Sequence, residues 1–198
     1  MNIMTRSYQL KRRAESQGKT RQKIIEAAIE LHQTKGPAAT SMGDIAARAK
    51  VGKVTVYRHF PDEAAMMGAC SGLYFQRHPF PDPDAWRSIP DAVEMLRQGL
   101  RETYAYHRAT EAMMNRVIPY MRDQPVMEPY HAHWRRIADV LAAAWPVTGH
   151  IKKMLKAALI LALSFETWRA LVQEQGLTEN QAIQLMLRLV CDCPPRPE

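Results

Sequence analysis

The sequence predicts an all-α protein, with a small N-terminal helix-turn-helix domain followed by a larger helical domain. Apolar residues recur every three or four positions through most of the 198 residues, a spacing that buries one face of a helix. Glycine and proline stand at the ends of these periodic segments. Only residues 51–60 have the composition of a β-strand, and no other segment offers them a partner strand.

The first two helices are defined by their ends. From Thr20, a suitable N-cap, the segment TRQKIIEAAIELHQTKG places apolar residues at helical spacing and stops at Gly36. Ser41 and Asp44 then form a variant of the capping box before apolar positions 42, 45, 46 and 49. We therefore expect one helix that begins at Thr20 and a short second helix that follows Ser41.

The stretch VGKVTVYRHF, residues 51–60, carries conflicting signals. Its β-branched residues favour a strand, but only residues 50–52 separate it from the second helix, which is the turn length of a helix-turn-helix unit. Gly52 can cap a helix in which Val56 and Phe60 face inward. Because an unpaired strand would leave backbone groups unsatisfied, we expect a third helix here.

The rest of the chain reads as further helices. Residues 61–78 form a fourth helix, and the proline-dense residues 78–84 form a connector. Pro119 should kink or end the helix that contains it, and Thr178 with Gln181 forms a capping box for the last helix. The helices expected after the connector cover residues 89–108, 110–124, 125–145, 150–176, which is the longest, and 178–193.

The positive charge is concentrated near the N-terminus. Residues 1–60 hold twelve Lys or Arg and four Asp or Glu, whereas residues 61–198 hold fifteen and sixteen. This asymmetry is typical of a polyanion-binding module attached to a near-neutral body. The longest apolar run, residues 157–163, is too short to cross a bilayer, so we expect a soluble protein with no membrane partner.

Cysteine usage and motif content exclude several classes of protein. Cys70, Cys191 and Cys193 form no disulfide framework, and no signal peptide is recognisable, so we expect a reducing cytoplasm. His131 and His133, like the last two cysteines, are two positions apart and lie on different faces of a helix, so we expect no metal site. No catalytic or cofactor-binding motif appears, and we expect neither catalytic residues nor a cofactor.

The N-terminal third resembles the TetR family of bacterial transcriptional regulators. The likeness rests on RQKIIEAAIELHQTKG, TSMGDIAARAKV and KVTVYRHF, between Arg21 and Phe60. A looser likeness to the family's C-terminal regulatory domain covers LSFETWRALVQEQGLTENQAIQLMLRLV. Three positions depart from the family's usual pattern: Lys50 replaces a turn glycine, Gly52 replaces a capping serine, and Glu63 replaces a lysine.

The resemblance implies a double-stranded DNA operator as partner, read by the third helix in the major groove. Lys53, Thr55 and Arg58 carry side chains suited to base edges. By the same resemblance, Tyr57, His59, Thr40 and Ser41 hold the phosphate backbone, and Arg48 and Lys50 add charge near the turn. Lys11, Arg12 and Arg13 belong to an N-terminal arm that is expected to follow phosphates or enter a minor groove.

The body is expected to sense a small molecule and to form a homodimer. The resemblance implies an effector pocket between helices, which the methionine-rich and aromatic composition suits. Helices at about 150–175 and 178–193 are apolar on more than one side, and we expect them to form a four-helix bundle with a second copy. The residues assigned to the effector are Tyr104, Met113, Met114, Tyr120, Trp134 and Phe165.

These features lead to a domain plan and a functional hypothesis. The plan has a flexible basic arm (1–19), a DNA-binding domain (20–60), a ligand-binding and dimerisation domain (61–193) and a tail (194–198). The hypothesis is a ligand-responsive repressor that binds a pseudo-palindromic operator and is released by a small, largely apolar effector. The alternative is a small helical enzyme or ligand carrier with a vestigial helix-turn-helix, which the replacements at Lys50 and Glu63 favour.

Overall fold

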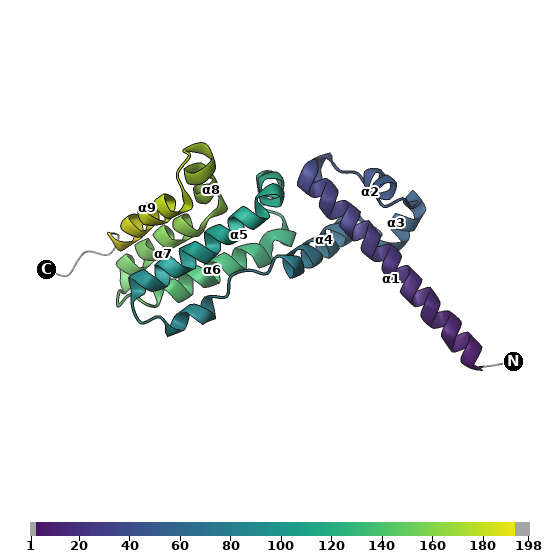
Figure 1. Ribbon diagram of the computed structural model, residues 1–198, viewed down its shortest axis with the longest axis horizontal. Helices are drawn as coiled ribbons and strands as arrows, with labels where there is room; N and C mark the ends of the chain where they lie inside the picture. The colour runs from purple at the N-terminus through teal and green to yellow at the C-terminus, as the bar shows by residue number, and fades with distance from the viewer. Residues whose placement is uncertain (1–2, 193–198) are drawn as a thin grey trace. The chain divides into compact units, whose positions relative to one another are not determined.

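The structure is a computed structural model that describes residues 3–192, apart from the side chains of residues 3–7 and 9. Within that range the chain consists of helices and loops with no strand, as predicted (Figure 1). It divides into two compact units, one of residues up to Arg77 together with 115–122, the other of residues 78–114 and from Asp123 onward. None of the described helices is long and apolar enough to span a membrane. Cys193 and the predicted tail fall outside the described residues.

The N-terminal unit is built on a three-helix core. Its helices are α1 (Ile3–Thr34), α2 (Met42–Arg48), α3 (Lys53–His59) and α4 (Glu63–Arg77). Both predicted caps of the second helix are present, because the Ser41 hydroxyl accepts from the Asp44 N–H and the Asp44 carboxylate accepts from the Ser41 N–H. The side chains buried most completely in the core include Ile24, Ala28, Ile45, Val56 and Phe60.

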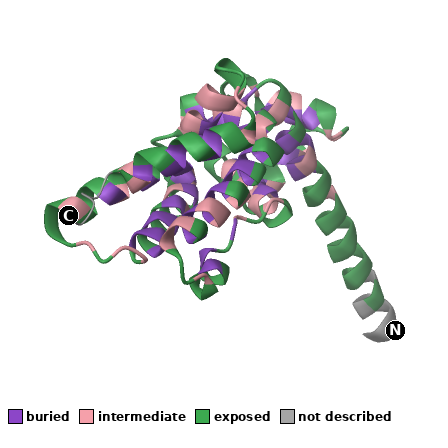
Figure 2. Cartoon of the chain, turned by 60° about the vertical axis from the view of Figure 1, so that its left-hand side comes forward, coloured by how far each residue is buried: buried purple, intermediate pink, exposed green. Residues whose placement is uncertain are grey.

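Helix α1 begins at Ile3, so the expected start at Thr20 is wrong. The Thr20 hydroxyl does not cap a helix; it donates to the Ser16 carbonyl, 3.0 Å away, within a continuing helix. The preceding residues are mostly Leu, Lys, Arg, Ala, Glu and Gln without proline, and these residues have high helix propensity. Residues 11–19 are exposed (Figure 2), so an exposed basic helix occupies the place of the expected flexible arm.

The second unit is a bundle of antiparallel and crossing helices. It contains α5 (Ala92–Met121) up to Met114, α6 (Glu128–Ala142), α7 (Gly149–Leu163), the single-turn α8 (Phe165–Trp168) and α9 (Glu179–Cys191). Helix α7 packs against both α6 and α9. The predicted capping box of the last helix is confirmed, with Thr178 and Gln181 in the expected roles.

Helix α5 joins two helices that the sequence analysis separates near residue 109. No glycine or proline interrupts this region, and the Thr110 hydroxyl donates to the Tyr106 carbonyl at 2.8 Å, a bond that leaves the helical ladder intact. Pro119 lies inside α5, two residues before its end. The proline therefore ends the helix at about the expected place, while the expected break before it is wrong.

The predicted helix over residues 150–176 is interrupted at Ser164. This residue has an extended backbone (φ −72°, ψ 144°), and its hydroxyl accepts from the Thr167 N–H to cap α8. The chain then continues through a π-helical turn, Arg169–Glu174. The break turns Phe165 and Trp168 into the core, where both are buried. A serine that can cap a new helix therefore prevails over the continuous apolar pattern around it.

Candidate nucleic-acid interface and ligand site

Helix α3 presents a polar outer face over two apolar anchors. The stretch with strand-like composition is helical, as its context predicts, and Val56 and Phe60 are buried on its inner side. Lys53, Tyr57 and Arg58 are exposed, while Thr55 and His59 are half-buried. Gly52 is the N-cap and offers no side-chain hydrogen bond. The arrangement leaves one face of a short helix available to a polyanion.

The turn before α3 is held by a strained lysine. The Val51 N–H donates to the Ala46 carbonyl at 3.0 Å, and the intervening Lys50 has φ 55°. This bond around a left-handed residue is the Schellman end of a helix, which normally has glycine at that position. Lys50 is the one non-glycine residue with positive φ that the described chain contains, so the turn carries the steric cost of a side chain in the left-handed region.

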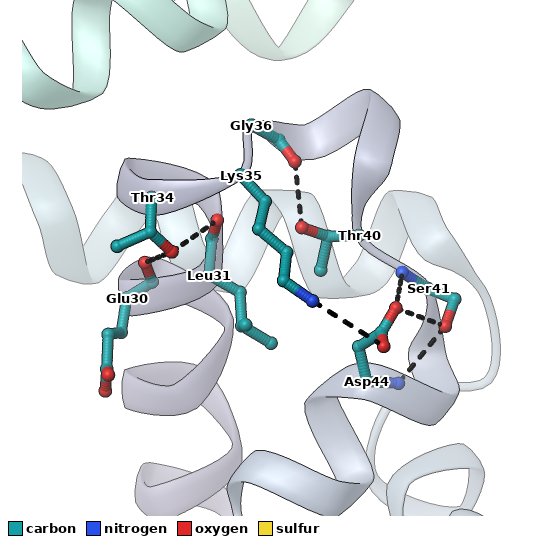
Figure 3. A network of polar contacts seen from close by, with 8 residues as sticks. All are labelled: Glu30, Leu31, Thr34, Lys35, Gly36, Thr40, Ser41 and Asp44. Carbon is teal, nitrogen blue, oxygen red and sulfur yellow. Dashed lines mark hydrogen bonds and ion pairs between the residues drawn. The ribbon is translucent and has the colours of Figure 1, made fainter.

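Thr40 and Ser41, assigned to phosphate, already have protein partners (Figure 3). The Thr40 hydroxyl donates to the Gly36 carbonyl at 2.8 Å, and the Ser41 hydroxyl donates to the Asp44 carboxylate at 2.7 Å. The two hydrogen bonds from Ser41 and the nearby Lys35 lower the pKa of Asp44. The backbone N–H groups are in use as well, because that of Thr40 donates to the Pro37 carbonyl and that of Ser41 to the Asp44 carboxylate. These residues can therefore contact a phosphate only after a rearrangement.

The assigned cations differ in how far they are neutralised. Arg48 is paired with Glu30, to which its Nε donates at 2.9 Å and its Nη2 at 2.5 Å. Lys53 extends over the Tyr57 ring, with its Nζ 6.0 Å from the ring centroid, at the limit of a cation–π contact. Lys50 and Arg58 form no ion pair with any carboxylate in residues 3–192. Lys50, Lys53 and Arg58 are therefore the assigned cations whose charge no carboxylate offsets.

His59 is less accessible than its assigned role requires. Its Nε2 is buried and has no hydrogen-bond partner among the described residues. Burial, then the charges of Arg58 and Arg21, lower the pKa of His59, which favours the neutral ring. The Arg21 guanidinium lies 4.9 Å from the Phe60 ring centroid. A contact between His59 and a phosphate would need the ring to turn outward.

Val54 is a surface residue that the sequence analysis did not assign. Its side chain is 84% exposed, on the same helix as the polar residues above. An apolar group on a recognition helix can contact a thymine methyl. The signal was present, because Val54 lies one turn before Arg58 on any helical wheel of this stretch, but the residue counted only toward the strand-like pattern.

The residues assigned to an effector are not all brought together. Tyr104, Met113, Met114, Trp134 and Phe165 are buried in the second unit. Tyr120 belongs to the N-terminal unit and is 66% exposed, so it is not buried with the other five residues. The Tyr104 hydroxyl donates to the Ala162 carbonyl at 3.2 Å, which holds the middle of α5 against α7.

An aromatic cluster surrounds His107, which the sequence analysis did not single out. Its ring centroid lies 5.1 Å from that of Trp134, 5.5 Å from Phe165 and 6.1 Å from Trp168. Its Nε2 donates to the Leu163 carbonyl at 2.9 Å. Burial lowers the pKa of His107 to about 4, against the opposing effect of that bond, so the ring is neutral at pH 7.

Two helices of the second unit expose apolar side chains. On α9, Ala182, Met186 and Val190 are buried while Leu185 and Leu189 are exposed. On α7 the exposed apolar side chains are Met154, Ile160 and Leu161. The buried set packs inside the chain, and the exposed set is what a second copy could cover. Within residues 3–192 no group of three His, Cys, Asp or Glu side chains is arranged to hold a metal ion.

Comparison with known proteins agrees with this geometry. A family model described as "Bacterial regulatory proteins, tetR family" matches residues 24–70, the segment that contains α2, α3, the end of α1 and the start of α4. Residues 24–70 are therefore similar to the N-terminal DNA-binding domain of the TetR family. The match covers the turn at Lys50 and the cap at Gly52, so the replacements there occur within a recognisable TetR domain.

Curated relatives match the same region. An HTH-type transcriptional regulator of Mycobacterium bovis and an HTH-type transcriptional repressor of Mycobacterium tuberculosis are each 50% identical to this chain over 46 residues. The match covers 23% of this chain and 24% of each relative, so the chain spans about a quarter of the length of these curated relatives. They are named as regulators and not as enzymes.

Solved structures share the fold of this chain. A TetR-like transcriptional regulator from Rhodococcus sp. RHA1 has a TM-score of 0.64 at 19% identity, over 87% of this chain and 93% of that chain. The multidrug binding protein EbrR, solved with imidazole, has a TM-score of 0.56 at 24% identity, over 89% and 90%. EbrR has also been solved with ethidium.

Proposed function

We propose that this chain is a TetR-family, ligand-responsive transcriptional repressor of the bacterial cytoplasm. A homodimer binds a pseudo-palindromic operator, and a small, largely apolar effector releases it. A matched relative is named as a repressor, which supports the direction of regulation. The concentration of positive charge in residues 1–60 supports a polyanionic partner.

The outer face of α3 is the observation that carries this proposal. Val56 and Phe60 anchor the helix, and Lys53 and Arg58 extend from its other side without a carboxylate partner in the described chain. In the major groove, Arg58 can donate two hydrogen bonds to a guanine, and Lys53 can donate to guanine O6 or N7. Thr55 offers its hydroxyl and methyl to base edges.

The remaining assigned residues have positioning roles. Tyr57, which is 44% exposed, reaches the phosphate backbone, and Lys50 adds charge at the turn. Arg48 contributes less because Glu30 shares its charge. Thr40, Ser41 and His59 contact phosphates after their present intramolecular bonds or burial are relieved, so we expect them to contribute less to affinity than α3.

Homodimerisation places two copies of α3 on one duplex. The exposed apolar side chains of α7 and α9 are suited to a two-fold interface, in which the same patch of each copy meets itself. The two recognition helices then read half-sites one helical turn or a multiple of it apart, roughly 34 Å. Operator symmetry follows directly from protein symmetry.

Effector binding belongs to the second unit. EbrR, a protein of the same fold, binds imidazole and ethidium, which supports small-molecule binding here. The effector changes DNA affinity by as much as its own affinity differs between the DNA-bound and released forms. Tyr104 of α5, Trp134 of α6 and Phe165 of α8 are buried and each lies near the His107 ring. We assign these three residues to the surroundings of the effector.

A binding assay on the DNA flanking this chain's own gene tests the proposal. Fluorescence anisotropy at several salt concentrations should show selective binding that weakens steeply with salt as counterions are released. Lys53→Ala should relax sequence preference by about 1–3 kcal/mol, whereas Tyr57→Phe should weaken all sites alike. Lys152→Ala on α7 is the matched control and should change neither. If the wild-type chain binds DNA without sequence preference, the proposal that it is a transcriptional regulator is wrong.

A further inference from the structure

Several buried polar atoms in the second unit lack hydrogen-bond partners and belong to neighbouring side chains. His107 Nδ1 and the indole nitrogens of Trp134 and Trp168 have no partner among the described residues. The centroid of the His107 ring lies 5.1 Å from that of Trp134 and 6.1 Å from that of Trp168. Thr103, whose hydroxyl is also buried without a partner, lies one helical turn before His107. A buried polar group without a partner is costly, and most such groups are satisfied.

The chemistry of the unpartnered histidine nitrogen is fixed by its other nitrogen. The Leu163 carbonyl only accepts hydrogen bonds, so His107 Nε2 carries the proton that it donates there. In the neutral ring Nδ1 is then an acceptor with a vacant lone pair. The indole N–H groups of Trp134 and Trp168 are donors. The cluster therefore combines one unused acceptor with two unused donors.

We propose that this cluster is the polar centre of the effector site and binds a flat, neutral aromatic molecule whose hydroxyl donates a hydrogen bond to His107 Nδ1. The hydroxyl oxygen can in turn accept from an indole N–H, which satisfies two orphaned atoms with one ligand group. The inference rests on the proposed function only in calling the ligand an effector; the site itself does not require DNA binding.

The surroundings select the shape and charge of this ligand. Phe165 meets the His107 ring edge to face, at an interplanar angle of 86°, and the two tryptophans add further aromatic surface. Such surroundings favour a flat ring through stacked and edge contacts. The cluster consists of aromatic rings and a hydroxyl with no charged member, so a charged ligand would lose its hydration without compensation.

Three probes that share one ring test the inference on the full-length chain. 4-Chlorophenol carries the donor, 4-chloroanisole replaces it with a methyl ether, and 4-chlorobenzoate is charged. Titrations followed by tryptophan fluorescence and calorimetry should show that the phenol binds one site per chain. The anisole and the benzoate should bind at least about tenfold more weakly, because loss of one buried hydrogen bond has roughly that effect.

Two variants separate His107 from its neighbours. His107→Phe keeps a ring but removes the acceptor, and it should abolish the preference for the phenol over the anisole. His133→Phe is the matched control: that ring lies in the same unit and stacks on Phe80 at 4.4 Å, and the preference should remain. Should His107→Phe not fold, nitrogen NMR of the wild-type chain replaces it, since the Nδ1 resonance of His107 must shift when the phenol binds and stay when the anisole is added.

Equal affinity for phenol and anisole, or no binding of the phenol to the folded chain, would overturn the inference. So would a crystal structure in which ordered waters satisfy these atoms and persist in saturating phenol. A phenol that binds at His107 but leaves DNA affinity unchanged contradicts the proposed effector response and supports the site. If the chain without added phenol shows no selective DNA binding, the proposed function is wrong, but the phenol site is not affected by that result.

Discussion

Lys50 is a position where folding stability and DNA affinity favour different residues. The turn between α2 and α3 needs a left-handed residue there, and lysine meets that need at φ 55° with a steric cost that glycine lacks. We expect Lys50→Gly to raise the free energy of unfolding by about 1 kcal/mol, measured by urea denaturation, and to lower DNA affinity. Lys50→Ala keeps the strain and removes the same charge. Equal stability of the two variants would contradict the role assigned to backbone strain.

Residue-scale signals were reliable where a side chain acts on its own backbone. The capping pairs at Ser41 and Thr178 and the left-handed residue at position 50 follow from short-range chemistry, and the structure has them all. His107 could not be found in this way. Its importance comes from Leu163 and from rings more than 20 positions away in the sequence, and no local pattern encodes those contacts.

At the scale of elements, the neighbouring turn predicts the helix α3 correctly against the strand propensity of its residues. The apolar pattern around Ser164 predicts a continuous helix, which is wrong. The strand-like residues 51–60 form a helix because the preceding turn and the absence of a partner strand leave no other way to satisfy their backbone. At Ser164 the helix breaks because Phe165 and Trp168 turn inward, and the sequence around Ser164 carries no signal for that burial. Periodicity reports which positions are apolar, but it does not report where a helix stops to redirect them.

The helical start of α1 changes what the basic N-terminal segment can do on DNA. An α-helix with side chains is about 10–12 Å wide, whereas the minor groove is about 6 Å wide, so residues 11–19 cannot enter it as a helix. We expect them to bind phosphates. The combined variant Lys11→Ala, Arg12→Ala, Arg13→Ala should weaken every DNA site alike and lower the salt slope by about 0.9 for each phosphate that is no longer neutralised.

The control for that variant changes the same kind of charge in the other unit. Lys152→Ala with Lys153→Ala, both exposed on α7, should leave affinity and salt slope unchanged. If the N-terminal variant instead alters preference between A·T-rich and G·C-rich flanks, the segment enters the minor groove in an extended form, and the phosphate assignment is wrong.

At the scale of the molecule, the sequence predicts which part of the chain binds DNA, but it does not predict which residues surround a ligand. Charge asymmetry and the motif in residues 21–60 predicted a DNA-binding module, and the family model matches that region. The proposed effector site depends on how α5, α6, α7 and α8 meet. Tyr120 was grouped with it on residue type alone, although it is an exposed residue of the other unit.

We expect the exposed leucines of α9 to form part of a two-fold interface with a second copy of the chain. Leu185→Glu places a charge in a surface that dimerisation would bury, and an unpaired buried charge is strongly unfavourable. We expect the variant to be monomeric in sedimentation velocity at concentrations where the wild-type chain is dimeric, with helical content retained because Leu185 is 43% exposed in the single chain. Its affinity for a full operator should fall to about that for one half-site, since the second recognition helix is no longer held in place. Gln184→Glu adds the same charge to the neighbouring exposed position and should remain dimeric; a dimer that survives Leu185→Glu would assign the interface to another surface.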